Sequence, residues 1–193
     1  MPSRLLNLRH RLRWRDFQGQ VPPSSEFSAE TDTRMRLNYG YASSGGQIRL
    51  TDNVVVTVQL RRAHSWARRG AVRTAALLNH EQRHYDITAL MSRDFFIDMM
   101  QLKTRTFASR GDLDQEVRGL AAHYASQPIH DQYDDETDHG QRAADQRRWD
   151  CMINRAFSTA RSPAVTAPDG TAYKIRLLNV LNGNAGACVP ATP

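Results

Sequence analysis

The sequence has no apolar stretch long enough to span a membrane, which takes about 20 predominantly apolar residues. Basic residues crowd the first 17 positions, but no continuous apolar segment follows them, so no secretory signal is visible. We therefore expect either a protein that stays inside the cell or a chain that begins after a removed leader or at a truncated start. The length of 193 residues and the 40% hydrophobic content fit one globular domain.

Cysteine is scarce. The chain has only Cys151 and Cys188 and no CxxC pair, which excludes a zinc knuckle built from cysteines. The two residues form one disulfide in an oxidising compartment, or they stay two unconnected thiols. The spacing alone does not decide between these states.

Acidic residues are outnumbered, 20 against 26 Lys and Arg, which gives a net charge of +6 and a pI near 9.8. Such a surface favours anionic partners such as nucleic acid, anionic lipid or an acidic polymer. No nucleic-acid module and no basic motif interleaved with aromatic residues accompanies the charge. We expect a solvated basic face and keep nucleic acid as an alternative partner.

Apolar and polar residues alternate over 33–43, and residues 54–60 are β-branched and apolar. Both patterns are typical of strands and predict a small antiparallel sheet within 31–62. Residues 1–30 are expected to be irregular.

Glycine and proline are absent from 71 to 107, where apolar residues recur at helical spacing. This pattern predicts one long helix, or two helices broken near Ser92. Further helices are expected over about 112–126 and 141–160, which makes 65–160 a helical region. The tail, 161–193, is predicted to be irregular with a short strand at 173–178. The whole chain, 1–193, is predicted to be one α+β domain.

The helical region contains the sequence NHEQRH at 79–84, an HExxH motif. Residues four apart lie one turn apart on the same helix face, so His80 and His84 can reach one metal ion. Glu81 projects beside that face and can contact a water on the metal without ligating it. Zinc lowers the pKa of that water and polarises a carbonyl, and Glu81 acts as general base and acid. The alternative is two ordinary histidines on a helix.

A catalytic zinc site needs a third protein ligand. A histidine six residues after His84 would be the metzincin pattern, but Leu90 stands there, which excludes that class. The segment 132–140, QYDDETDHG, is dense in metal-capable residues where a helix gives way to a glycine. Its composition fits a solvated acidic loop equally well.

Three segments of the chain together match a known pattern: 12–19 (LRWRDFQG), Ser65-Trp66 with 77–87 (LLNHEQRHYDI), and 133–140 (YDDETDHG) followed by Gln146 and Trp149. On these residues the chain resembles the predicted secreted zinc-dependent proteases of bacteria grouped as DUF922. The last segment, YDxxTxHG, is the most discriminating. The resemblance implies a zincin-like fold, in which a small sheet packs on the active-site helix and a helical subdomain follows. It also implies peptide hydrolysis and export.

The resemblance further implies a set of site residues. His139 is the expected third zinc ligand, by its place in TxHG, with Glu136 and Asp138 as alternatives. Other roles extend from this. Asp134 or Asp86 would hold a ligand imidazole in the correct tautomer. Tyr133 or Tyr85 would donate to the tetrahedral oxyanion, with packing as the favoured alternative for each.

We therefore predict a zinc metallopeptidase that binds Zn²⁺ through His80, His84 and His139 and acts on a peptide or protein substrate. One alternative is an intracellular, DNA-associated metalloprotease with the same zinc site. A second is a catalytically silent binding module that the metal only stabilises.

Overall fold

The computed structural model describes residues 3–70, 73–125, 128–158, 165–166, 172–173 and 188. The described elements follow one another in the order β1 (Arg4–Leu6), η1 (Trp14–Asp16), β2 (Ala29–Glu30), β3 (Thr33–Ser44), β4 (Gln47–Leu60), β5 (Trp66–Ala67), α1 (Ala75–Leu102), α2 (Arg110–Ala125), α3 (Ile129–Thr137), α4 (Ala143–Ser158), β6 (Val165–Thr166) and β7 (Ala172–Tyr173). The class is α+β, as predicted. Among the described residues, no helix is both long and apolar enough to cross a membrane.

The main sheet has the strand order β1-β4-β3. β3 and β4 form a long antiparallel hairpin, as expected, but β1 pairs in parallel with β4, with Arg4 opposite Val55. The predicted sheet over 31–62 is antiparallel, but β1, from the segment 1–30 that was expected to be irregular, makes the whole sheet mixed. β1 has three residues and β2 has two, which is too short for an alternating pattern to show.

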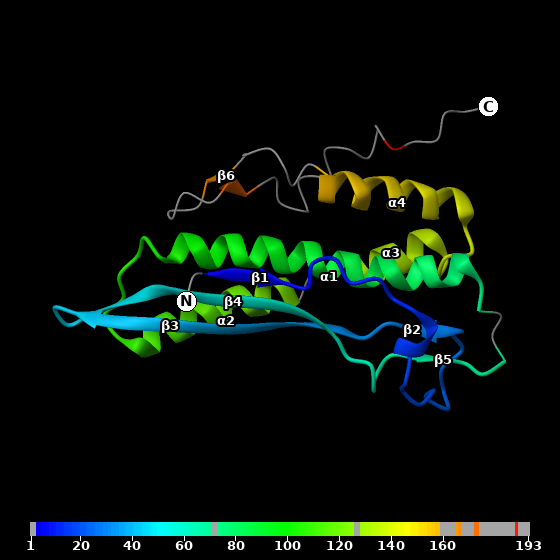
Figure 1. The fold of residues 1–193 in the computed structure, drawn as a ribbon, viewed down its shortest axis with the longest axis horizontal. Coiled ribbons are helices and arrows are strands. Elements are labelled where there is room, and N and C mark those ends of the chain that lie inside the picture. The colour runs from blue at the N-terminus through cyan, green and yellow to red at the C-terminus, as the bar shows by residue number, and fades with distance from the viewer. Residues whose placement is uncertain are drawn as a thin grey trace.

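Helix α1 runs unbroken for 28 residues along one side of the sheet (Figure 1). It begins after Thr74, whose side chain accepts a hydrogen bond from the Leu77 backbone amide at 3.0 Å. No break occurs at Ser92, which is buried and whose hydroxyl donates to the Thr88 carbonyl within the helix at 2.7 Å.

Two apolar clusters divide α1 into halves. Toward its C-terminal end, Phe95 and Met99 pack with Val56 of β4 and Leu113 of α2. Toward its N-terminal end, Tyr85 and Ile87 pack with residues of α3 and α4, including Tyr133 and Trp149. Figure 1 shows α3, α4, β2 and β5 gathered at the N-terminal end of α1, where the HExxH motif lies.

The acidic segment after Gln132 is mostly helical, not a loop. Three residues of α3 spaced four apart, Ile129, Tyr133 and Thr137, are buried and form one continuous face. The acidic residues between these three make the apolar face hard to recognise in the sequence. The helix places Asp134 opposite α1.

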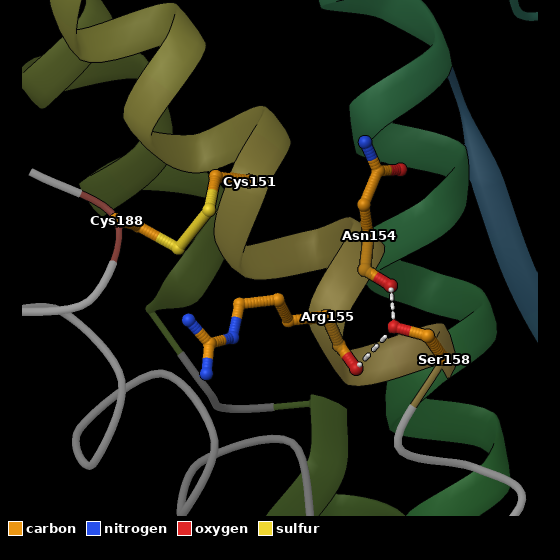
Figure 2. Close-up of a disulfide and its surroundings, with 5 residues drawn as sticks. All are labelled: Cys151, Asn154, Arg155, Ser158 and Cys188. Carbon is orange, nitrogen blue, oxygen red and sulfur yellow. Dashed lines mark hydrogen bonds between the residues drawn. A yellow bond between two sulfur atoms is a disulfide. The ribbon is translucent and has the colours of Figure 1, made fainter. Parts of the chain in front are cut away.

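A disulfide joins Cys151 of α4 to Cys188, 37 positions later (Figure 2). It resolves the two states left open by the sequence in favour of pairing. The strand predicted at 173–178 coincides with β7 only at Tyr173. The rest of that predicted strand lies outside the described residues.

We expect reduction of the Cys151–Cys188 disulfide to lower the free energy of unfolding by about 2–4 kcal/mol, because the bond restricts a long loop in the unfolded chain. Urea unfolding with and without reductant, both in EDTA so that metal binding does not enter, measures this change. The double variant Cys151→Ser/Cys188→Ser should be insensitive to reductant. Equal stability of the oxidised and reduced wild-type protein would contradict a structural role for the bond.

Candidate metal centre

The HExxH turn of α1 and the middle of α3 bring three potential ligand atoms together. The Nε2 atoms of His80 and His84 lie 3.3 Å apart, and each lies 3.0 Å from Oδ1 of Asp134. These are the residues that could hold a metal ion in the described part of the chain. The two histidines were predicted as ligands. Asp134 was expected only to hydrogen-bond one of the ligand imidazoles.

The geometry of the three atoms fits a metal. Ligands roughly 2.0–2.2 Å from a tetrahedral zinc stand about 3.3 Å from one another. The observed separations are close to that value. Oδ1 of Asp134 is also buried, and both imidazole Nε2 atoms point toward it. A cation between the three residues would satisfy this oxygen.

The predicted third ligand, His139, stands beside this group and not within it. Its Nδ1 lies 3.6 Å from Oδ1 of Asp134, and its side chain is 41% exposed. The ring packs on Phe27, with centroids 4.5 Å apart. Among the described residues, the third member of the candidate ligand group is therefore Asp134, whereas His139 was expected.

The alternative carboxylates are placed elsewhere. Glu136 accepts hydrogen bonds from the Trp149 indole and from Arg148, both at 2.8 Å. Asp138 ends α3 in a left-handed conformation and does not line the cavity at the site. Neither residue belongs to the group that could hold a metal.

A neutral amide supports His80 from behind. Nδ1 of His80 lies 3.2 Å from Oε1 of Gln146, which also accepts a hydrogen bond from the Tyr133 hydroxyl at 2.9 Å. The amide nitrogen of Gln146 donates to Asp150 at 2.9 Å, which fixes the direction of its oxygen. The Tyr133 ring also stacks on His80, with centroids 4.7 Å apart. Sequence reasoning assigned no role to Gln146, although its place after the acidic segment pointed to it.

A second histidine supports His84. Nδ1 of His84 lies 3.1 Å from Nδ1 of His130, whose Nε2 lies 3.2 Å from the Thr88 hydroxyl. Burial lowers the pKa of His130 to about 4, and repulsion from His84 adds to the effect. Burial also disfavours the charged form of His84, but the hydrogen bond and attraction from Asp134 outweigh it and raise its pKa. The sequence offered no signal for His130.

The carboxylate of Glu81 is buried beside the two ligand histidines, and its Oε2 has no hydrogen-bond partner. Burial raises its pKa, and attraction from His84, the Thr31 hydroxyl and His80 offset part of the rise. A carboxylate with a raised pKa, poised next to the ligands, suits proton transfer near neutral pH.

The remaining residues with expected roles point away from the cavity. Asp86 accepts hydrogen bonds from Gln82 and Arg83 and supports no ligand imidazole. The hydroxyl of Tyr85 donates to the Asn7 carbonyl at 2.6 Å. Neither Tyr85 nor Tyr133 lines the cavity, so both anchor the structure and neither faces an oxyanion.

The cavity at the site has a volume of about 860 Å³. The stretch from Glu26 to Thr33 lines one side of it, and parts of α1 and the turn after α3 line the other. Ser65 and Trp66 hold that first wall: Ser65 accepts a hydrogen bond from the Asp32 amide at 2.9 Å, and the Trp66 indole donates to Glu30 at 3.1 Å.

The turn after α3 approaches the first ligand closely. Asp138, His139 and Gly140 all have positive φ, 50°, 50° and 83°. A Cβ at Gly140 would lie 3.0 Å from Cβ and Cγ of His80. Only glycine combines this conformation with such a close approach without strain.

We expect Gly140→Ala to lower zinc affinity and the free energy of unfolding, because the methyl group would push the His80 ring off Gln146. The left-handed backbone alone costs about 1–2 kcal/mol for a residue with a Cβ. Gly46→Ala is the matched control, because Gly46 has a φ of 74° and open space around it. It should lose a similar stability but keep its zinc affinity, as measured by urea unfolding and chelator competition. Equal zinc affinity of the two variants would contradict the contact with His80.

No protein-family model matches the sequence, and neither a curated protein nor a solved structure matches it. The resemblance to the DUF922 proteases therefore rests on the motifs of the chain itself.

Proposed function

We propose that the protein is a zinc-dependent peptidase in which His80, His84 and Asp134 hold the metal and Glu81 is the general base and acid. The observation that carries the proposal is the convergence of the three ligand atoms, 3.0–3.3 Å apart, next to a buried glutamate. Three protein ligands with a fourth position open to a cavity are typical of a catalytic zinc site.

Zinc at this site would polarise the peptide carbonyl and acidify water. Glu81 accepts the proton of the attacking water and delivers it to the leaving amine. Its Oε2 has no hydrogen-bond partner among the described residues, and its raised pKa lies closer to that of the leaving amine that it protonates. His139 lines the cavity next to Asp134 and is placed to donate to the oxygen of the tetrahedral intermediate, a role first assigned to the tyrosines.

Two histidines and one carboxylate also suit Fe(II) in oxygenases. Glu81 favours hydrolysis, because a buried carboxylate beside the metal ligands supplies the proton transfer that peptide cleavage needs. Metal analysis of the purified protein should find about one zinc per chain. Iron at that stoichiometry, with no zinc, would contradict the proposal.

The motif resemblance supports the same reading, and the disulfide agrees with export, because such bonds persist in oxidising compartments. The alternatives of a DNA-associated protease and a silent metal-stabilised module share the metal centre.

Glu81→Gln should keep zinc bound but lower the hydrolysis of fluorescently labelled casein by about 10²–10⁴-fold, the usual contribution of a general acid–base group. The substitution keeps the size of the side chain and removes only its basicity. Zinc content and casein turnover are measured on the same preparation. Zinc-loaded wild-type protein that cleaves neither casein nor a mixture of unstructured peptides would favour the silent module.

Asp134→Ala should abolish stoichiometric zinc binding, whereas His139→Ala should keep it and lose casein turnover. The reason is that Asp134 lies 3.0 Å from both histidines and His139 stands outside that group. Asp135→Ala is a suitable control, because this neighbouring carboxylate on α3 is exposed. The opposite result, with zinc lost in His139→Ala and kept in Asp134→Ala, would restore His139 as the third ligand.

A further inference from the structure

Two helix faces meet at the metal centre with the same spacing. On α1, His80, His84 and Thr88 lie four residues apart and form one row. On α3, His130 and Asp134 are also four residues apart. Asp134 reaches His80 and His84, and His130 reaches His84 and Thr88.

The hydrogen bonds of the second contact fix a direction. A metal at Nε2 of His84 requires the imidazole proton to sit on Nδ1, so Nδ1 donates to Nδ1 of His130. His130 must then carry its own proton on Nε2, which donates to the Thr88 hydroxyl. The Thr88 hydroxyl continues the chain to the Thr33 hydroxyl of β3, 2.6 Å away.

We propose that His130 is a positioning residue of the metal centre, which sets the tautomer and rotation of the His84 ring and aligns α3 so that Asp134 meets the same point. This inference rests on the proposed metal site. The two rings are nearly parallel, at an interplanar angle of 22°, and the bond between their Nδ1 atoms is 3.1 Å. Because His130 and Asp134 share one face of α3, one contact governs the placement of two ligands.

The groups that hydrogen-bond Nδ1 of the two ligand histidines are uncharged. His84 donates to an imidazole and His80 to the Gln146 amide. Carboxylates are common partners in such positions, and they raise the basicity of the ligand. With neutral partners, Asp134 is the one carboxylate within the ligand group, so less negative charge reaches the metal.

The test compares His130→Leu with His130→Asn. Leucine removes the acceptor, and we expect zinc affinity to fall about 10–100-fold, as for other outer partners of metal ligands. Asparagine can place its Oδ1 near the position of Nδ1, so it should restore affinity to within a few-fold of wild type. Zinc affinity is measured by chelator competition, and the visible absorption of the Co²⁺-substituted protein should change in the leucine variant and return toward wild type with asparagine.

His123→Leu is the matched control, because it removes a histidine from the exposed surface of α2, away from the cavity. It should leave the affinity and the Co²⁺ spectrum unchanged. Circular dichroism of the metal-free variants shows that each is folded. Wild-type zinc affinity and an unchanged Co²⁺ spectrum in His130→Leu would overturn the inference, as would asparagine behaving like leucine. Wild-type protein that binds neither Zn²⁺ nor Co²⁺ would instead overturn the metal site itself.

Discussion

The contact of the Asp134 carboxylate with the two imidazoles is the interaction on which the rest of the site depends. It joins α1 to α3 through residues 50 positions apart in the chain, His84 and Asp134. Burying a carboxylate is costly unless charged or hydrogen-bonding partners compensate it, and the two imidazoles supply such partners here. The packing of α3 on α1 therefore places a carboxylate where it contacts two imidazoles at once and where a cation could bind all three groups.

The two variable positions of the HExxH motif anchor the turn of α1 that carries it. Gln82 accepts a hydrogen bond from the Leu12 amide and donates to the His10 carbonyl, which holds the N-terminal segment on α1. Arg83 pairs with Asp150 of α4 at 2.8 Å. The same turn is thus fixed on one side by the N-terminal segment and on the other by α4, while its histidines face the cavity. This arrangement limits movement of the ligand rings.

Some backbone strain accompanies the site. Asp138 and His139 are successive non-glycine residues with positive φ, a conformation that is uncommon outside glycine. Such strain tends to occur where function requires a particular side-chain direction. Here the turn carries His139 into the cavity wall and lets Gly140 approach His80. The physical basis of the TxHG part of the motif is this turn, with the Thr137 hydroxyl accepting from the Gly140 amide at 3.3 Å.

The sequence by itself determined the long helix, the β3–β4 hairpin and the HExxH face, because local spacing dictates which side chains share a side. Only the tertiary structure decided what meets that face. The position of Asp134, closer than His139 to both histidines, depends on the rotation of α3 against α1, and the contact of His130 with His84 depends on the same docking. Periodicity reports which residues lie together on one element, but it carries no information on how two distant elements pack.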